Sequence, residues 1–327
     1  MRAQHLLPRK ACQVNGYPAE AMLSVAYGYH WITAARMAAK WQIPFYLIIH
    51  DEPLQLTVLP GFLRPSLRSA FSAAYRQARE RFCVSPYMEA EYLANYGVRG
   101  TVLYPSRAAE SPTWQTPPRR DCNSTGLKVA FAGTINSPGY AGLLGLLVNC
   151  LQDGDSLVLF GPHTAFSLKS WQVDSNKIRL GGLIPPDQII ERLRSEFDVL
   201  FVPMSFDPTE ADNMRKGFPS KIADYSATGV PMLICGPEYC SAVHWARTFS
   251  PVAEVVTSPD SAALASALQR LSSASHRSLL AERALAIGEQ LFSHTAAQEI
   301  LYGSLRGNRV KPPNVLEAST LSIQPET

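Results

Sequence analysis

The chain has 327 residues, of which 46% are hydrophobic and 17% are charged, and its formal net charge is +3. This composition supports large hydrophobic cores and argues against a disordered chain. The small net charge excludes the dense basic face of a dedicated nucleic-acid-binding protein, so we expect no nucleic-acid partner. At this length two domains are expected.

Targeting and metal-binding signals are weak throughout the chain. No apolar run approaches the length of about 18 residues that a membrane span requires. The first residues, Met1 to Gln4, are not followed by the apolar core of a signal peptide, so we expect a cytoplasmic protein. The six cysteines are scattered without a C-x-x-C pair, which predicts neither a metal site nor a disulfide framework.

The first part of the chain alternates between strand and helix patterns. Residues 22–27 are typical of a strand, residues 30–41 of a helix, and residues 44–49 of a strand that is covered on both faces. His50 and Asp51 follow this last strand, where open α/β sheets place ligand-binding side chains. Two interpretations remain open here. The pair contributes to an active site, or it pairs locally and shapes the turn.

A long basic helix is predicted over residues 61–81. Its side chains would contact an anionic acceptor or the inner face of a membrane. Such a set is more often a solvated helix face. The basic residues are Arg64, Arg68, Arg76, Arg79 and Arg81. A strand at residues 82–85, a helix at residues 86–96 that ends at Gly97, and a strand at residues 101–104 follow.

The composition changes over residues 105–126, which are rich in proline and polar residues and have little apolar patterning. This is the best domain boundary in the chain. The predicted organisation is an N-terminal domain over 1–108, a linker over 109–126, a C-terminal domain over 127–306 and a flexible tail over 307–327.

A second α/β pattern begins after this boundary. Residues 128–132 predict a strand, residues 133–139 a glycine-containing loop and residues 141–151 a helix. Such a loop can admit a phosphate close to the backbone, but it matches neither the dinucleotide fingerprint nor the P-loop. Taken alone, it is better interpreted as a tight turn. Further strands are predicted at 156–160, 178–180, 198–203 and 252–256, helices at 186–195, 239–247, 259–273 and 278–306, and a polar loop at 204–217. Two parallel-sheet α/β domains are therefore expected.

One stretch in this half predicts an anion site. A helix is expected to begin at Pro219 and to end at Gly229, followed directly by a buried strand. Ser220 and Lys221 would lie in its first turn, where free N–H groups and the helix dipole favour an anion. A lysine opposes the dipole there unless an anion lies between the two, which points to a bound phosphate.

The same stretch, FPSKIADYSATGVPMLICGP, resembles the donor-site helix and strand of family-4-like GT-B glycosyltransferases. Two other stretches, RFCVSPYMEAEYLANYGVRGTVLYPS and IRLGGLIPPDQIIERLRSEFDVLFVP, are similar to that family at the level of the fold. The resemblance covers roughly residues 40–245. It implies two Rossmann-like parallel-sheet domains facing a cleft, with a first domain that is shortened and incomplete at its front.

The resemblance implies a glycosyltransferase of polysaccharide biosynthesis. It would be hexosyltransferase-like, retaining and metal-independent, with a UDP- or GDP-sugar as co-substrate and no resident cofactor. Ser220, Lys221 and Arg215 would hold the diphosphate, whose growing negative charge fixed cations stabilise in the transition state. Asp224 would bind the ribose. Gly133 and Thr134 would approach the phosphates, Leu183 and Ile184 would lie against the base, and His50 and Asp51 would face a glycan, lipid or small-molecule acceptor.

The chain also departs from the family pattern. Lys216 stands where many relatives carry the acidic residue that contacts the donor sugar, and Glu210 and Asp212 are the acidic side chains of the same loop that would replace it. The second acidic position is Asp224 rather than Glu. The alternative function is therefore a non-catalytic homologue that binds a nucleotide or a partner protein. A sugar-nucleotide epimerase of the same fold is a third hypothesis.

Overall fold

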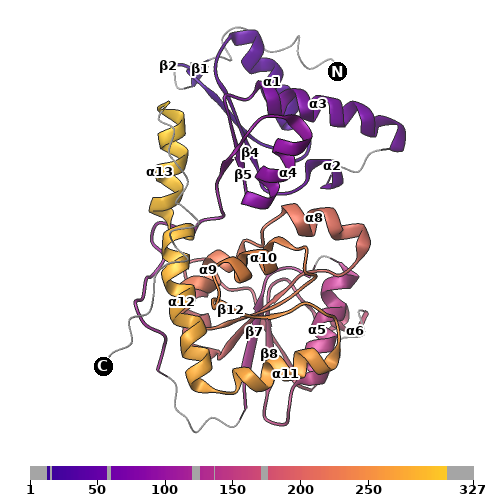
Figure 1. Cartoon of the computed structure of the whole chain (residues 1–327), viewed down its shortest axis with the longest axis vertical. Helices are drawn as coiled ribbons and strands as arrows, with labels where there is room; N and C mark the ends of the chain where they lie inside the picture. Colours follow the sequence, from indigo (N-terminus) through magenta and orange to yellow (C-terminus); the bar gives the residue numbers. More distant parts are fainter. Residues whose placement is uncertain are drawn as a thin grey trace. The chain divides into compact units, whose positions relative to one another are not determined.

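The computed structural model describes residues 13–14, 17–56, 60–119, 126–135, 137–170 and 176–307. The chain forms two compact units (Figure 1). Unit 1 comprises Met1–Tyr104 and Arg215–Phe218, and unit 2 comprises Pro105–Met214 and Pro219–Thr327. The division falls after Tyr104, and the described part of the expected linker, 109–126, clusters with unit 2. The expected tail lies outside the described residues beyond Gly307.

Unit 1 contains a four-stranded parallel sheet in the order β3-β4-β5-β6. Burial explains the parallel arrangement, because four of the five residues of β4 are buried and a parallel sheet is normally covered on both faces. The strands are β3 (Met22–Val25), β4 (Phe45–Ile49), β5 (Glu80–Cys83) and β6 (Thr101–Val102), and the helices are α1 (His30–Trp41), α2 (Pro53–Leu56), η3 (Gly61–Leu63), α3 (Arg64–Gln77) and α4 (Pro86–Tyr96). A separate antiparallel pair is formed by β1 (Gln13–Val14) and β2 (Tyr17–Pro18).

Unit 2 contains a six-stranded parallel sheet in the order β12-β11-β10-β7-β8-β9. The strands are β7 (Lys128–Ala132), β8 (Ser156–Phe160), β9 (Ile178–Gly182), β10 (Val199–Pro203), β11 (Met232–Cys235) and β12 (Ala253–Val256). The helices are α5 (Pro138–Cys150), α6 (Ala165–Ser170), α7 (Ile189–Glu196), η4 (Pro208–Glu210), α8 (Ala211–Lys216), α9 (Lys221–Thr228), α10 (Ser241–Thr248), α11 (Ser261–Leu271), α12 (Ala274–Phe292) and α13 (His294–Leu305). Side chains of α5 and α11 form one core with the sheet, whereas α7 and α12 pack on α9.

The expected α/β fold with two parallel sheets is confirmed, and several element boundaries differ from the prediction. Strand β5 begins inside the predicted helix 61–81, because Ala78 leaves the helical conformation and the Arg79 amide donates to Phe45 in β4. The predicted helix 278–306 is two helices that meet at Ser293, whose hydroxyl accepts a hydrogen bond from the Ala296 amide. The predicted polar loop 204–217 contains η4 and α8.

Candidate functional site

A cavity of about 360 Å³ lies within unit 2, where three parallel strands end. Gly133 follows β7, Gly161 follows β8 and Leu183 follows β9, and all three line the cavity. Asp224 reaches it from α9. The remaining lining residues are Ala108, Ser111, Ala132, Phe160, Ile184, Pro186 and Ile189. The mostly apolar wall with one carboxylate suits a flat organic group that carries hydroxyls.

Helix α9 begins at Lys221, two residues later than predicted. Pro219 and Ser220 form a tight turn before it, in which the amides of Ile222 and Ala223 donate to the carbonyls of Pro219 and Ser220. The helix ends at Gly229 as predicted, with a left-handed φ of 67°.

Tyr225 fixes this helix to the end of β7. Its buried hydroxyl accepts a hydrogen bond from the Ala132 amide at 2.7 Å and donates to the Ala132 carbonyl at 3.3 Å. Both backbone groups lie directly before Gly133. The first turns of α9 are therefore held against the glycine loop, and this places Lys221 next to it.

Lys221 is half-buried and contacts an aromatic ring instead of a carboxylate. Its Nζ lies 4.3 Å from the centroid of the Phe131 ring, and it would be 3.4 Å from a Cβ atom on Gly133. Among the described residues, no acidic side chain forms an ion pair with it. Desolvation lowers the pKa of Lys221 to about 8. A desolvated cation without a counterion, next to an open glycine loop, favours binding of an anion.

The glycine loop has a conformation that other residues rarely adopt. Gly133 has a φ of 146° and donates its amide to the Phe160 carbonyl at 2.9 Å. Gly161 has a φ of 144°, and a Cβ atom there would collide with the Gly133 carbonyl and the His163 ring. His163 Nε2 donates to the same carbonyl at 2.8 Å. Sequence analysis missed His163, although its position just after β8 and Gly161 was the available signal.

Asp224 has a basic residue nearby that sequence analysis also missed. Burial raises the pKa of Asp224, and the positive charge of Arg107 opposes that shift. Arg107 is buried and donates from Nη2 to the Gly288 carbonyl at 2.6 Å and to Glu289 at 3.1 Å. Arg107 therefore links the segment after β6 to α12 while it neutralises part of the charge near the cavity.

The other predicted site residues lie elsewhere. Thr134 and Ser220 are exposed and do not line the cavity, and the Ser220 side chain makes no capping hydrogen bond. Arg215 is exposed and belongs to unit 1. The structure thus brings together Gly133, Leu183, Ile184 and Asp224, with Lys221 beside them. These assignments remain predictions.

His50 and Asp51 lie in unit 1, directly after β4. Burial lowers the pKa of His50, and the charge of Asp51 opposes this shift. Burial raises the pKa of Asp51, opposed by the charge of His50. The two side chains therefore interact electrostatically at the carboxyl end of a parallel strand, where a ligand is expected.

Of the two acidic residues expected to replace the missing carboxylate, Glu210 lies closer to the glycine loop. Its Oε2 accepts a hydrogen bond from Ser137 at 3.0 Å and would lie 3.2 Å from a Cβ atom on Gly139, at the start of α5. Asp212 is exposed on α8. Lys216 is buried in unit 1, where it pairs with Glu52 and Glu91.

The described ranges hold neither a cluster of metal-ligand side chains nor a helix suited to cross a membrane. In those ranges, no group of three or more His, Cys, Asp and Glu side chains is placed to hold a metal ion. None of the described helices combines the length and the apolar character that a membrane crossing demands.

Comparisons with known proteins show the fold. No family model and no curated protein matches the sequence. Among solved structures, sucrose-phosphate synthase from Thermosynechococcus elongatus is 14% identical with a TM-score of 0.65, and covers 91% of this chain and 75% of its own. HepE from Anabaena in complex with UDP-glucose is 16% identical with a TM-score of 0.63, and covers 85% of this chain and 76% of its own.

A third similar structure is the apo form of the lipopolysaccharide outer core galactosyltransferase WaaB, at 11% identity and a TM-score of 0.57. It covers 89% of this chain and 75% of its own. The chain therefore has the GT-B glycosyltransferase fold that the sequence motif implied, with two Rossmann-like parallel-sheet domains. A fold alone does not assign a reaction, which has to be argued from the site.

Proposed function

We propose that this protein is a glycosyltransferase that moves a sugar from a nucleotide-sugar to an acceptor. The observation that carries the proposal is Lys221, a desolvated cation without a carboxylate partner among the described residues, held beside the Gly133 loop. The complexes of HepE with UDP and UDP-glucose support a nucleotide-sugar donor.

In the proposed reaction, the bond between the sugar C1 atom and the diphosphate breaks, and a bond to the acceptor oxygen forms. The diphosphate then gains negative charge, which Lys221 and the positive end of the α9 dipole stabilise. Leu183 and Ile184 offer an apolar surface to the base, and Asp224 accepts hydrogen bonds from the ribose hydroxyls. Because Lys221 supplies positive charge, the proposed transfer is metal-independent.

The acceptor side is proposed to use His50 and Asp51. Desolvation lowers the pKa of His50, so the imidazole is neutral near pH 7 and able to accept the proton of an acceptor hydroxyl. In a retaining transfer, the departing phosphate oxygen takes this proton instead, and His50 then orients the hydroxyl. Retention and hexosyl transfer are the forms that the family resemblance implies.

Side chains at the start of α3 favour the hypothesis that the acceptor lies at a membrane surface. Phe62 is 79% exposed and Leu63 is also exposed, and Arg64 and Arg68 follow them on the surface. Arg64 and Arg68 line a hollow of about 540 Å³ together with Ser69, Ser72, Asn95 and Tyr96. Exposed apolar and basic side chains in one place fit a peripheral contact with anionic lipid.

Two lysines on unit 2 test the proposal. Lys128 is exposed at the amino end of β7, opposite the end that leads to Gly133, so Lys128→Ala is a matched control for Lys221→Ala. Transfer and hydrolysis of UDP- and GDP-sugars should fall by about 100-fold or more in Lys221→Ala and stay unchanged in Lys128→Ala. Equal rates in the wild type and in Lys221→Ala contradict the proposal.

A second candidate is the non-catalytic homologue. The observation that favours it is the burial of Lys216 in unit 1 at the position where relatives carry a sugar-contacting carboxylate. Calorimetry that detects UDP or GDP binding, without turnover across a panel of donors and acceptors, would select this candidate.

A further inference from the structure

A short segment of the chain crosses from one unit to the other and back. Met214 is buried in unit 2, where its sulfur accepts a hydrogen bond from Tyr140 at 3.9 Å. The next four residues, Arg215–Phe218, belong to unit 1, and the chain re-enters unit 2 at Pro219. This segment directly precedes the turn that starts α9 and carries Lys221.

Lys216 attaches the segment to other residues of unit 1. Its Nζ lies 2.7 Å from Glu52 Oε2 and 3.0 Å from Glu91 Oε1, and its side chain is only 8% exposed. The Lys216 carbonyl accepts a hydrogen bond from the buried hydroxyl of Ser85 at 2.9 Å. The Tyr92 hydroxyl donates to Glu52 Oε2 at 3.2 Å. These groups come from the ends of β4 and β5 and from α4.

The charges in this cluster depend on one another. Desolvation lowers the pKa of Lys216, but hydrogen bonds and charges from Glu52 and Glu91 outweigh it and raise the pKa overall. Glu52 is almost completely buried. Loss of Lys216 would therefore leave the buried carboxylate of Glu52 without a cation, whereas loss of Glu91 would leave one ion pair in place.

Only a short, conformationally restricted segment separates this attachment from Lys221. Gly217 and Phe218 are buried, and the Phe218 ring packs on Tyr104 with centroids 5.0 Å apart. Pro219 has a restricted φ angle. An extended chain advances at most about 3.6 Å per residue. Because so few residues lie between Lys216 and α9, a displacement of Lys216 would also move the start of α9.

We propose that Lys216, held by Glu52 and Glu91, is a positioning residue for Lys221, because it fixes residues 215–218 and thereby the start of α9. This proposal rests on the proposed function, in which Lys221 binds the donor diphosphate. Lys216 then acts through the chain and does not contact the donor. The lysine at the position of the relatives' carboxylate thus holds the segment that precedes α9.

The test measures UDP and GDP binding by the full chain, using calorimetry between pH 7 and pH 9.5. Lys216→Met and Glu52→Gln should weaken nucleotide binding at least fivefold. They should also raise the pH above which nucleotide affinity decreases. When the start of α9 is less firmly held, Lys221 is better hydrated and its pKa is higher. A purely structural role of Lys216 would not move this pH step. Lys216→Arg keeps a cation for both carboxylates, so this variant should bind nucleotide with the affinity and the pH step of the wild type.

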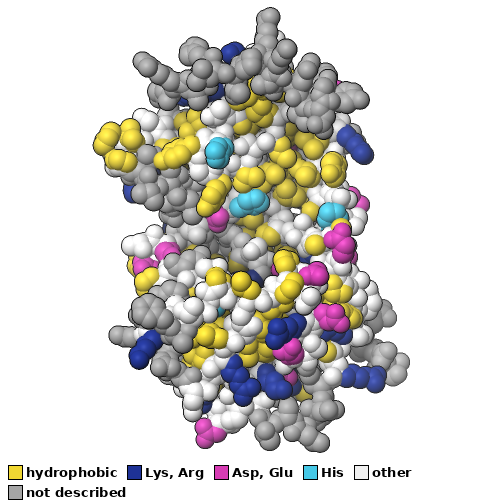
Figure 2. Space-filling model, turned by 180° about the vertical axis from the view of Figure 1, so that it is seen from behind, with side chains coloured by type: hydrophobic (Ala, Val, Ile, Leu, Met, Phe, Trp, Pro, Cys, Tyr) yellow, Lys and Arg dark blue, Asp and Glu magenta, His cyan; other side chains and the backbone are white. Residues whose placement is uncertain are grey.

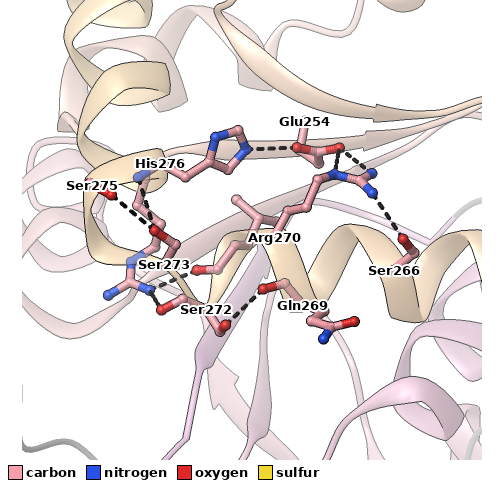
Figure 3. Close-up of polar contacts among 10 residues, drawn as sticks. Glu254, Ser266, Gln269, Arg270, Ser272, Ser273, Ser275 and His276 are labelled. Carbon is pink, nitrogen blue, oxygen red and sulfur yellow. Dashed lines mark hydrogen bonds and ion pairs between the residues drawn. The ribbon is translucent and has the colours of Figure 1, made fainter.

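The control is a buried carboxylate elsewhere that has an arginine and a histidine as partners. Glu254 on β12 accepts hydrogen bonds from Arg270 Nε and His276 Nε2, both at 2.9 Å, in the network of Figure 3. Glu254→Gln should lower the thermal midpoint while leaving the nucleotide affinity and its pH step unchanged. Glu91 is half-exposed, so Glu91→Gln keeps one ion pair and is expected to fold, with a smaller shift in the same direction.

The outcomes separate the two proposals. If the wild type binds UDP or GDP, and folded Lys216→Met, Glu52→Gln and Glu91→Gln bind it with unchanged affinity and pH step, the positioning role is wrong. Should Lys216→Met and Glu52→Gln fail to fold, Glu91→Gln alone decides in the same way. A folded wild type that binds neither nucleotide overturns the proposed function itself.

Discussion

The two units differ in how their polar groups are assembled. In unit 2, the groups around the cavity come from the ends of neighbouring strands and from the start of α9, and Lys221 has no acidic partner among the described residues. In unit 1, Lys216 is enclosed by carboxylates that are distant in the sequence. Two lysines five positions apart therefore have pKa values shifted in opposite directions.

This difference separates a binding lysine from a structural one. Desolvation without a counterion lowers the pKa of Lys221 to about 8, and this cost is relieved when an anion binds. Lys216 already has its counterions, so a further anion gains nothing there. Figure 2 shows Lys, Arg, Asp and Glu side chains close to one another on the visible, described surface of unit 2.

The largest expected effect concerns the stability of unit 1. Lys216→Met leaves Glu52 buried without its cation, so we expect the free energy of unfolding to fall by about 3–5 kcal/mol. Urea unfolding followed by tryptophan fluorescence reports this loss, since Trp31 is buried in unit 1. Glu91→Gln leaves a neutral pair and should change stability by less than about 1 kcal/mol. Similar losses in both variants would show that Lys216 is not enclosed as described.

The contrast also explains what the sequence could predict. Strand-end glycines and the helix stop at Gly229 are local features, so the loop at Gly133, the cavity wall at Leu183 and Ile184, and most elements followed from pattern and motif. The ion pairs of Lys216 join residues 164 and 125 positions apart, and no local pattern predicts that residues 215–218 return to unit 1. His163 and Arg107 were missed because each acts through a distant backbone or side-chain partner.

The next effect concerns the glycine loop of unit 2. Gly161→Ala places a side chain in a strained conformation and against the Gly133 carbonyl, and such strain costs about 1–3 kcal/mol. We expect UDP affinity to fall by roughly 10-fold or more. Gly142→Ala is the control, because a Cβ atom there meets nothing within 4 Å inside helix α5 and should be neutral or slightly stabilising. If both variants bind UDP like the wild type, the loop does not approach the donor.

A smaller effect should appear as a pH dependence that only one of the two lysines controls. The free protein loses the Lys221 proton as the pH rises through about 8, whereas a bound diphosphate favours the protonated form. UDP affinity should therefore be constant below that pH and fall about tenfold per pH unit above it. Lys221→Arg stays protonated and should remove this step. A step that persists in Lys221→Arg would assign the titration to another group.

The last prediction compares the exposed face of unit 1 with that of unit 2. If the start of α3 contacts a membrane, each arginine there contributes about 1 kcal/mol of attraction to anionic lipid, so Arg64→Gln together with Arg68→Gln should weaken binding to phosphatidylserine vesicles by roughly 10-fold to 30-fold. Arg192→Gln on unit 2 is the control, because Arg192 is half-exposed and already paired with Glu196. The interaction should weaken with added salt, since the charges are screened. Vesicle binding that is equal in the double variant and the wild type would leave Arg64 and Arg68 as solvated side chains.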